Sequence, residues 1–318
     1  MNIAFWDNNL CERGTTVSLF DYAYYNQSYL KNKSFVFYDK KRVETKPHVV
    51  AHFKKHFVVH ETNGFDEVDQ FIRKYNINIV YIIKAGGRDN RFSRIAKNCI
   101  HCVFSCSEPH GDIYSAIAPW VNANNGRFPV VPHMINLPKH ERNLREQLGI
   151  PNSAVVFGGY GGEDNFDIKF VHEVVYRIAQ NFPNIYFLFA NFKRFSPVQS
   201  NIIHLPTITD LDEKTTFINT TDAMLWARSG GEVMSIAMGE FSTLNKPIIC
   251  TKTGGNGHVH LLKEKAIWYT NKTDLFDILT TFDPIVERTK DWNAYKEYTP
   301  EKVMDIFNKT FIQPFVTN

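Results

Sequence analysis

The sequence predicts an α/β protein built from two doubly wound, parallel-sheet domains that face each other across a cleft. Short, nearly continuous apolar runs recur along the chain, which is typical of parallel strands buried on both faces. Apolar residues at helical spacing lie between most of these runs. The alternation stops at a proline-rich segment, 132–138, and then restarts, and a length of 318 residues is natural for two domains.

The first half supplies most of one sheet. Its expected strands are 2–6, 34–38, 57–60, 77–84, 100–106, 113–118 and 129–131. Its expected helices cover 17–24, 65–75 and, as a short piece, 91–97. We place the first domain boundary at residues 135–136, within the proline-rich linker.

The second half repeats the pattern. A polar helix over 139–148 precedes a strand over 154–157, which ends in the glycine-rich run 158–162, and a helix over 166–182 follows. Further strands are expected over 184–190, 202–205, 223–226, 247–250 and 266–269. The second domain ends near residue 290, and the tail 291–318 is expected to be helical to about residue 311, with Pro300 as the start signal for its last helix.

Composition excludes several classes of protein. The net charge of +3 is too small to indicate a nucleic-acid partner, and no apolar run is long enough to span a bilayer. The N-terminus lacks the features of a signal peptide, and the five cysteines are an odd number, so we expect a cytoplasmic protein, with a peripheral place at a membrane left open. Cys99, Cys102 and Cys106 predict no metal site, since one strand would hold them apart.

The segment 223–247 carries the clearest chemical signal. An expected strand is followed by a turn at 228–231 and by a helix that starts near Met234 or Ser235 and ends near residue 245. Backbone N–H groups of Val233, Met234 and Ser235 would be unpaired at the helix start, which favours a diphosphate. Glu232 in the turn and Glu240 in the helix would accept hydrogen bonds from sugar diols. The alternative is a glycine-rich turn capped by Glu232, with Glu240 a solvated surface residue.

Taken together, the linker VVPHMIN, the strand end FGGYGG and the spacing of Glu232 and Glu240 resemble the Rossmann-like GT-B glycosyltransferases, most nearly their retaining family-4 type. The resemblance implies that residues 1–135 form the acceptor side and 136–290 bind the donor, while the C-terminal helices pack back on the first domain. Glu232 would meet hydroxyls of the donor sugar, and Glu240 the ribose diol. Further implied contacts are Val233, Met234 and Ser235 with the diphosphate or the sugar, Ile208 with the base, Gly14 with the phosphates or the acceptor, and His110 with the reacting centre.

The sequence also departs from this pattern. Relatives carry an arginine at the end of the first strand of the second domain and a lysine a few residues later, both facing the diphosphate. Here Gly159 or Tyr160 takes the first position, and Asn165-Phe166 the second. A diphosphate leaving group needs cationic or dipolar stabilisation, so we expect Lys193, Arg194 or Arg228 to supply it.

These features predict a metal-independent glycosyltransferase that needs no cofactor. It would move a sugar, with retention, from a nucleotide-diphosphate sugar such as a UDP or GDP sugar to a hydroxyl of a glycan, lipid or small molecule. Two alternatives stay open: a nucleotide-sugar epimerase of the same fold, and a non-catalytic nucleotide-sugar-binding module. A NAD oxidoreductase is disfavoured, because the G-x-G-x-x-G spacing is not met after Gly159.

Overall fold

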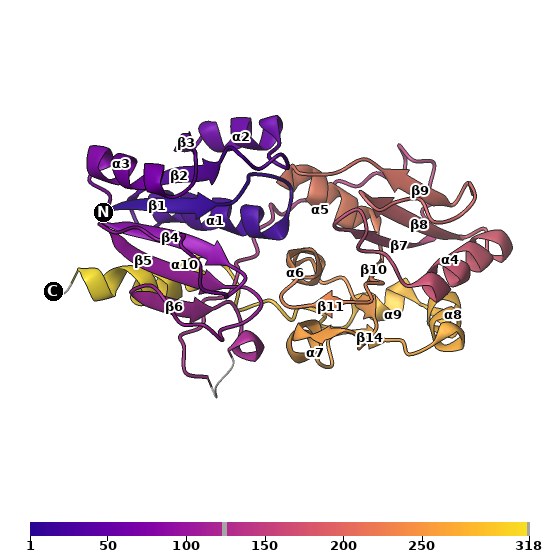
Figure 1. Cartoon of the computed structure of the whole chain (residues 1–318). Coiled ribbons are helices and arrows are strands. Elements are labelled where there is room, and N and C mark those ends of the chain that lie inside the picture. The colour runs from indigo at the N-terminus through magenta and orange to yellow at the C-terminus, as the bar shows by residue number, and fades with distance from the viewer. Residues whose placement is uncertain (123–125, 317–318) are drawn as a thin grey trace. The chain divides into compact units, whose positions relative to one another are not determined.

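A computed structural model describes residues 1–122 and 126–316, and Figure 1 shows its elements. The chain divides into two units, one formed by Met1–Met134 with Glu297–Asn318 and the other by Ile135–Lys296. Each unit is built on a six-stranded sheet whose recorded strand pairs are all parallel. The predicted α/β fold of two doubly wound parallel sheets is therefore confirmed.

The first unit has the strand order β3-β2-β1-β4-β5-β6. Its strands are β1 (Asn2–Asp7), β2 (Lys33–Asp39), β3 (Val58–Thr62), β4 (Ile79–Lys84), β5 (Lys97–Cys102) and β6 (Ile113–Ala116). Its helices are α1 (Gly14–Ser28), α2 (Pro47–Lys54), α3 (Asp66–Tyr75) and the short η1 (Pro119–Val121). The strand order reverses between β1 and β4, and ligands in such sheets bind at the carboxyl ends of the strands beside a reversal of this kind.

The C-terminal segment belongs to the first unit. It consists of α10 (Pro300–Phe307), the π-helical η2 (Asn308–Ile312) and η3 (Gln313–Phe315), and α10 begins at the predicted Pro300. The ring of Phe307 lies 5.2 Å from that of Tyr22 and 6.4 Å from that of Phe5, between centroids. Phe311 lies 5.3 Å from Tyr81 in the same way. Aromatic packing of this kind fixes the end of the chain on the core of the first unit.

The second unit has the strand order β14-β12-β10-β7-β8-β9. Its strands are β7 (Val155–Tyr160), β8 (Ile185–Ala190), β9 (Ile202–Leu205), β10 (Ala223–Leu225), β12 (Ile248–Cys250) and β14 (Ile267–Trp268). Its helices are α4 (Lys169–Asn181), α5 (Leu211–Thr220), α6 (Ile236–Thr243), α7 (Gly257–Leu262), α8 (Lys272–Thr281) and α9 (Pro284–Arg288). The reversal of strand order lies between β10 and β7, so the loop between β10 and α6 borders it.

A two-stranded ribbon in this unit pairs β11 (Gly231–Glu232) with β13 (Gly255–Asn256). Gly231 has a φ of +65°, and a Cβ atom added to it would lie 2.4 Å from the backbone oxygen of Gly255. Gly254 has a φ of +81° and is just as tightly enclosed by the backbone of Gly230 and Gly231. The glycines in this turn thus serve backbone-to-backbone packing.

Two predicted helices are absent from the structure. Residues 91–96 are irregular because side chains take their backbone N–H groups: Ser93 Oγ accepts from Ile95 and Ala96, and Asp69 accepts from Arg94. Lys97 already belongs to β5. Short polar side chains that compete in this way disfavour helix.

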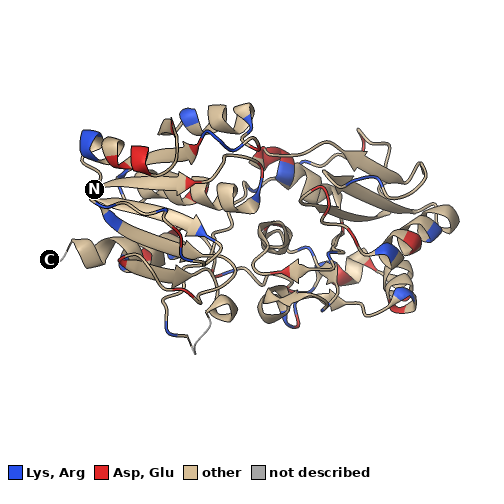
Figure 2. Cartoon of the chain, viewed as in Figure 1, with Lys and Arg blue, Asp and Glu red and all other residues tan. Residues whose placement is uncertain are grey.

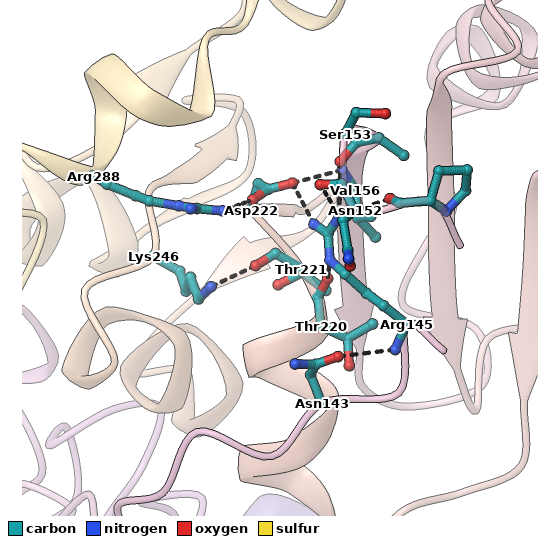
Figure 3. A network of polar contacts seen from close by, with 12 residues as sticks. Asn143, Arg145, Asn152, Ser153, Val156, Thr220, Thr221, Asp222, Lys246 and Arg288 are labelled. Carbon is teal, nitrogen blue, oxygen red and sulfur yellow. Dashed lines mark hydrogen bonds and ion pairs between the residues drawn. The ribbon is translucent and has the colours of Figure 1, made fainter. Parts of the chain in front are cut away.

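Residues 139–148 contain only a turn near residues 144–148, because the Leu144 backbone and the Arg145 side chain form hydrogen bonds with residues outside this segment. Leu144 N–H donates to Thr220 Oγ1, and the Arg145 guanidinium donates to the carbonyls of Thr220 and Ala154. Arg145 also pairs with the buried Asp222 at 2.8 Å, within the network drawn in Figure 3. This network joins the first residues of the second unit to the amino-terminal ends of β7 and β10.

Other, smaller differences concern the bounds of elements. β7 runs on to Tyr160, so Gly158 and Gly159 lie inside a strand; a Cβ on Gly158 would lie 2.4 Å from Thr221 Cγ2, and one on Gly159 2.9 Å from Leu225 O. The expected strand 129–131 is a single bridge between Val130 and Ala116. The helical tail begins only at residue 300. β5 ends at Cys102, so the strand argument that kept Cys102 and Cys106 apart was wrong, although the described residues hold no cluster of three or more His, Cys, Asp or Glu suited to a metal.

Within residues 1–122 and 126–316, no helix combines the length and the apolar character needed to cross a membrane.

Candidate functional site

Glu232 lies in the segment after β10 and is shielded from solvent. Its side chain is only 11% exposed, and its Oε1 lies 2.8 Å from Nη1 of Arg228, four residues earlier in sequence. Burial raises the pKa of the Glu232 carboxyl above its usual range, although Arg228 and His258 both act to lower it. The carboxylate is thus desolvated and held mainly by one guanidinium, which itself is more than one third exposed.

His258 of α7 supports the same loop through both of its ring nitrogens. The Glu232 N–H donates to Nδ1 of His258 at 3.3 Å, and Nε2 lies 2.8 Å from the carbonyl oxygen of Thr251. A carbonyl only accepts, so Nε2 carries the proton and Nδ1 is free to accept. The backbone of Glu232 is therefore positioned by the buried side chain of His258.

The helix α6 begins where the sequence predicts. Ser235 is its N-cap, and Ser235 Oγ accepts from the N–H of Met238 at 3.3 Å. The Tyr295 hydroxyl donates to the Ser235 carbonyl at 3.0 Å and so fixes the backbone at the N-cap of the helix. Val233, Met234 and Ser235 thus form the approach to a capped helix N-terminus, a place suited to an anion. The interpretation of Glu232 as the helix cap is wrong, because Ser235 has that role.

Glu240 lies inside α6 and is 3% exposed, so the alternative that it is a surface residue is wrong. Its Oε1 lies 2.8 Å from Nζ of Lys214 on α5, and its Oε2 accepts from the Tyr160 hydroxyl at 2.5 Å. Burial raises the pKa of Tyr160 well above its usual value, and the adjacent Glu240 adds to this. Three elements, β7, α5 and α6, thus meet at one buried carboxylate.

The remaining donor-side candidates lie apart from this cluster in their contacts. Lys193 is exposed and pairs with Asp164 at 2.6 Å. Arg194 is exposed, and Ile208 is half-buried in the loop after β9. Gly159 lies within β7, where the absence of a side chain allows the backbone of β10 to approach closely. The charges of the chain are spread over its elements with both signs mixed (Figure 2).

In the first unit, Gly14 is the first residue of α1, after β1. The preceding residue, Arg13, pairs with the buried Asp7 at the end of β1. His110 follows β5 and is half-buried; its Nδ1 lies 2.7 Å from the Glu108 carbonyl and its Nε2 3.0 Å from Nζ of Lys84. Lys84 and Lys214 are residues that sequence reasoning missed.

Lys214 left a signal that could have been read. It lies three and four positions before Phe217 and Ile218, on the apolar side of α5, where a solvated lysine is out of place. Lys84 likewise ends a continuous apolar strand. The contact of His258 depends on a backbone N–H brought to it by the ribbon of β11 and β13, and the sequence alone does not give this contact.

Comparison with known proteins bears on the fold. No family model matches the chain, and a search of curated proteins finds no match either. Among solved structures, HepE from Anabaena in complex with UDP-glucose has a TM-score of 0.71 at 13% identity over 97% of this chain and 99% of that one. Sucrose-phosphate synthase from Thermosynechococcus elongatus has a TM-score of 0.72 at 13% identity over the whole of both chains.

A third solved structure, from Listeria monocytogenes, is assigned as a UDP-N-acetylglucosamine 2-epimerase. It has a TM-score of 0.57 at 11% identity over 97% of this chain and 96% of that one. At these identities the likeness concerns the fold and leaves the chemistry open. The chain has the two-unit, parallel-sheet fold of the GT-B glycosyltransferases.

Proposed function

We propose that this protein transfers a sugar, with retention, from a nucleotide-diphosphate sugar to a hydroxyl acceptor. The observation that carries the proposal is the loop between β10 and α6. It holds a desolvated carboxylate, Glu232, three residues before the capped helix start at Ser235, beside the reversal of strand order. Solved structures of the same fold include a protein bound to UDP-glucose and a sucrose-phosphate synthase. The family-4 assignment rests on the resemblance in sequence.

The Arg228–Glu232 pair suits this role because both partners have a use for a donor. A guanidinium matches the geometry of phosphate oxygens and forms paired hydrogen bonds with them. When Arg228 turns to a diphosphate at the start of α6, Glu232 loses its cation and becomes free to accept from sugar hydroxyls. Phosphate binding and sugar binding would then support each other.

Glu240 fits a ribose less directly. Both of its oxygens already accept hydrogen bonds, from Lys214 and Tyr160. An ionised carboxylate has about four lone-pair positions, so a ribose hydroxyl can be added without removing either partner. In this proposal Glu240 is the ribose-facing carboxylate, and Lys214 stabilises its charge in a buried place.

The test compares Glu232→Gln with Glu173→Gln, a control that removes an exposed carboxylate paired with Lys272 in the same unit. Affinities for UDP, GDP and their glucose and mannose derivatives are measured by calorimetry, and sugar transfer by release of the nucleoside diphosphate. Glu232→Gln should keep the affinity for the matching nucleoside diphosphate, because Arg228 is freed, and lower kcat/KM for the sugar donor by about 10- to 150-fold, the equivalent of roughly 1.5–3 kcal/mol. An equal loss for nucleotide and donor would contradict the proposed role of Glu232.

Two other outcomes would redirect the assignment. One solved structure of this fold is described as an epimerase. Conversion of the donor sugar without any acceptor would favour that activity, and nucleotide binding with no turnover of any donor would favour a binding module. For the transferase we expect activity in the presence of chelators and in a cytoplasmic setting, and proton NMR of the product would show whether the anomeric configuration is retained.

A further inference from the structure

Lys84 occupies an unusual place for a charged residue. It ends β4 at the carboxyl edge of the first sheet, beside the reversal of strand order, and its side chain is only 3% exposed. Its Nζ lies 2.6 Å from Oδ1 of Asp89 and 3.0 Å from Nε2 of His110. Taking an ammonium out of water costs several kcal/mol unless its partners are well placed. In this structure Asp89 and His110 are the partners that offset the cost.

Asp89 is itself fixed, so the position of Lys84 is fixed as well. Arg91 donates to Asp89 twice, from its backbone N–H to Oδ1 at 3.0 Å and from Nε to Oδ2 at 2.6 Å. One carboxylate thus holds two cations, one buried and one partly exposed. The loop after β4 therefore presents the Lys84 ammonium to His110 in a defined direction.

The two contacts of His110 determine which nitrogen carries the proton. An ammonium can only donate, so Nε2 of His110 accepts from Lys84. A carbonyl can only accept, so Nδ1 donates to the Glu108 carbonyl. The ring is therefore neutral, in the Nδ1–H tautomer, with both nitrogens engaged. In this arrangement Nε2 cannot take a proton from an acceptor hydroxyl unless Lys84 first withdraws.

We propose that Lys84 is a positioning residue that fixes the tautomer and the orientation of His110, so that His110 enters the reaction as a neutral ring. The inference rests on the proposed function for its catalytic meaning, and on the three contacts alone for its structural meaning. It assigns a role to a lysine that sequence reasoning missed, and in this arrangement His110 does not act as a general base.

The groups that face His110 come from three elements. Lys84 comes from β4, Arg88 and Asp89 from the loop after it, and the ring of Tyr114 on β6 lies 5.4 Å from the imidazole between centroids. Burial lowers the pKa of His110, and Lys84 and Arg88 act in the same direction, whereas the Glu108 carbonyl and Asp89 act against it. Loss of the Lys84 charge should therefore raise the pKa of His110.

The experiment follows the ring nitrogens of His110 by nitrogen–proton correlation NMR in the substrate-free protein, with the signal assigned by its loss in His110→Gln. Lys84→Met removes the charge and the donor, and Lys84→Gln removes the charge but keeps a donor. Lys97→Met is the matched control, since Lys97 pairs with Asp112 at 3.2 Å and has no recorded contact with His110. Steady-state kinetics of sugar transfer, with kcat and KM separated, are measured on the wild type, the two Lys84 variants and Lys97→Met.

The wild-type ring should show the Nδ1–H tautomer and a titration midpoint below the ordinary value of about 6.5. Lys84→Met should raise the midpoint, mix the two tautomers and lower kcat about 10- to 100-fold with little change in KM, the loss expected of a misplaced group at a reacting centre. Lys84→Gln should keep the tautomer and recover part of kcat, and Lys97→Met should match the wild type. An Nε2–H tautomer in the wild type, or an unchanged titration in both Lys84 variants, would overturn the proposal.

The two readouts also separate this proposal from the proposed function. If the NMR results are as expected and no donor is turned over, the positioning of His110 stands and the transferase assignment fails. If transfer occurs and the ring titration ignores Lys84, the transferase assignment stands and the positioning role fails.

Discussion

The buried ion pair between Lys214 and Glu240 gives the most quantitative prediction. The two side chains are 11% and 4% exposed, and their N–O distance is 2.8 Å. Lys214→Met should leave the carboxylate in a nearly dry place with the Tyr160 hydroxyl as its recorded partner. Breaking a buried pair from one side costs about 3–5 kcal/mol.

Lys214→Met should therefore destabilise the second unit by about 3–5 kcal/mol, because one buried charge is left without its partner.

Hydrogen exchange of the amides in β7 and α6 measures this effect for the second unit alone, which matters because a chain of two units need not unfold in one step. Lys272→Met removes an exposed lysine paired with Glu173 and serves as the control, with no measurable change expected. Equal protection in Lys214→Met and wild type at pH 7 would refute the reasoning.

Two further predictions concern stability. His101 and His133 are buried in the first unit, and burial lowers their pKa values to about 3 and about 4, so below about pH 6.5 the unfolded chain takes up these protons and the folded unit does not. Each histidine should therefore lower the free energy of unfolding by about 1.4 kcal/mol per pH unit on acidification, and urea unfolding of the first unit at pH 7 and pH 5 should show a loss of stability that is smaller in His101→Gln. Gly231→Ala should destabilise the second unit by about 1–3 kcal/mol, because its φ is positive and its Cβ would strike the next strand. Gly230→Ala, whose Cβ meets no atom within 4 Å, should be tolerated, and equal melting temperatures for the two alanine variants would be evidence against the packing role of Gly231.

The fold was predictable because its signals are local and repeated. Short apolar runs locate most strands, and helical spacing locates α1, α3 and α4. The start of α6 after Ser235 and of α10 at Pro300 follows from a capping residue and from proline. The two wrong helices, 91–97 and 139–148, have composition that permits a helix. They are irregular because Asp69 and Thr220, far away in sequence, offer acceptors to their backbones. Spacing within a segment contains no information on such partners.

The candidate site was predictable in its carboxylates and not in their partners. The sequence places Glu240 in a helix, where the structure has it, and Glu232 in a turn, where the structure has the two-residue strand β11. It gives no account of Lys214, which reaches Glu240 from another helix, or of Lys84, which reaches His110 from another strand. Each of these contacts depends on how elements pack, so their discovery required the folded chain.

The same pairing principle recurs at the carboxyl edges of both sheets, and it limits how any ligand can bind. Arg13 is paired with Asp7, Lys84 with Asp89, Lys193 with Asp164 and Arg228 with Glu232. A diphosphate that recruits Lys193 or Arg228 therefore takes that cation from a carboxylate of the protein, and the measured affinity is the difference between two charged contacts. Taking Lys193 from the exposed Asp164 costs little, because exposed pairs contribute little. Separating Arg228 from the desolvated Glu232 costs more free energy. This cost is offset only if a sugar hydroxyl then donates a hydrogen bond to the carboxylate. A bare nucleoside diphosphate should for this reason engage Lys193 first, while the intact sugar donor is the ligand that can use Arg228 and Glu232 together.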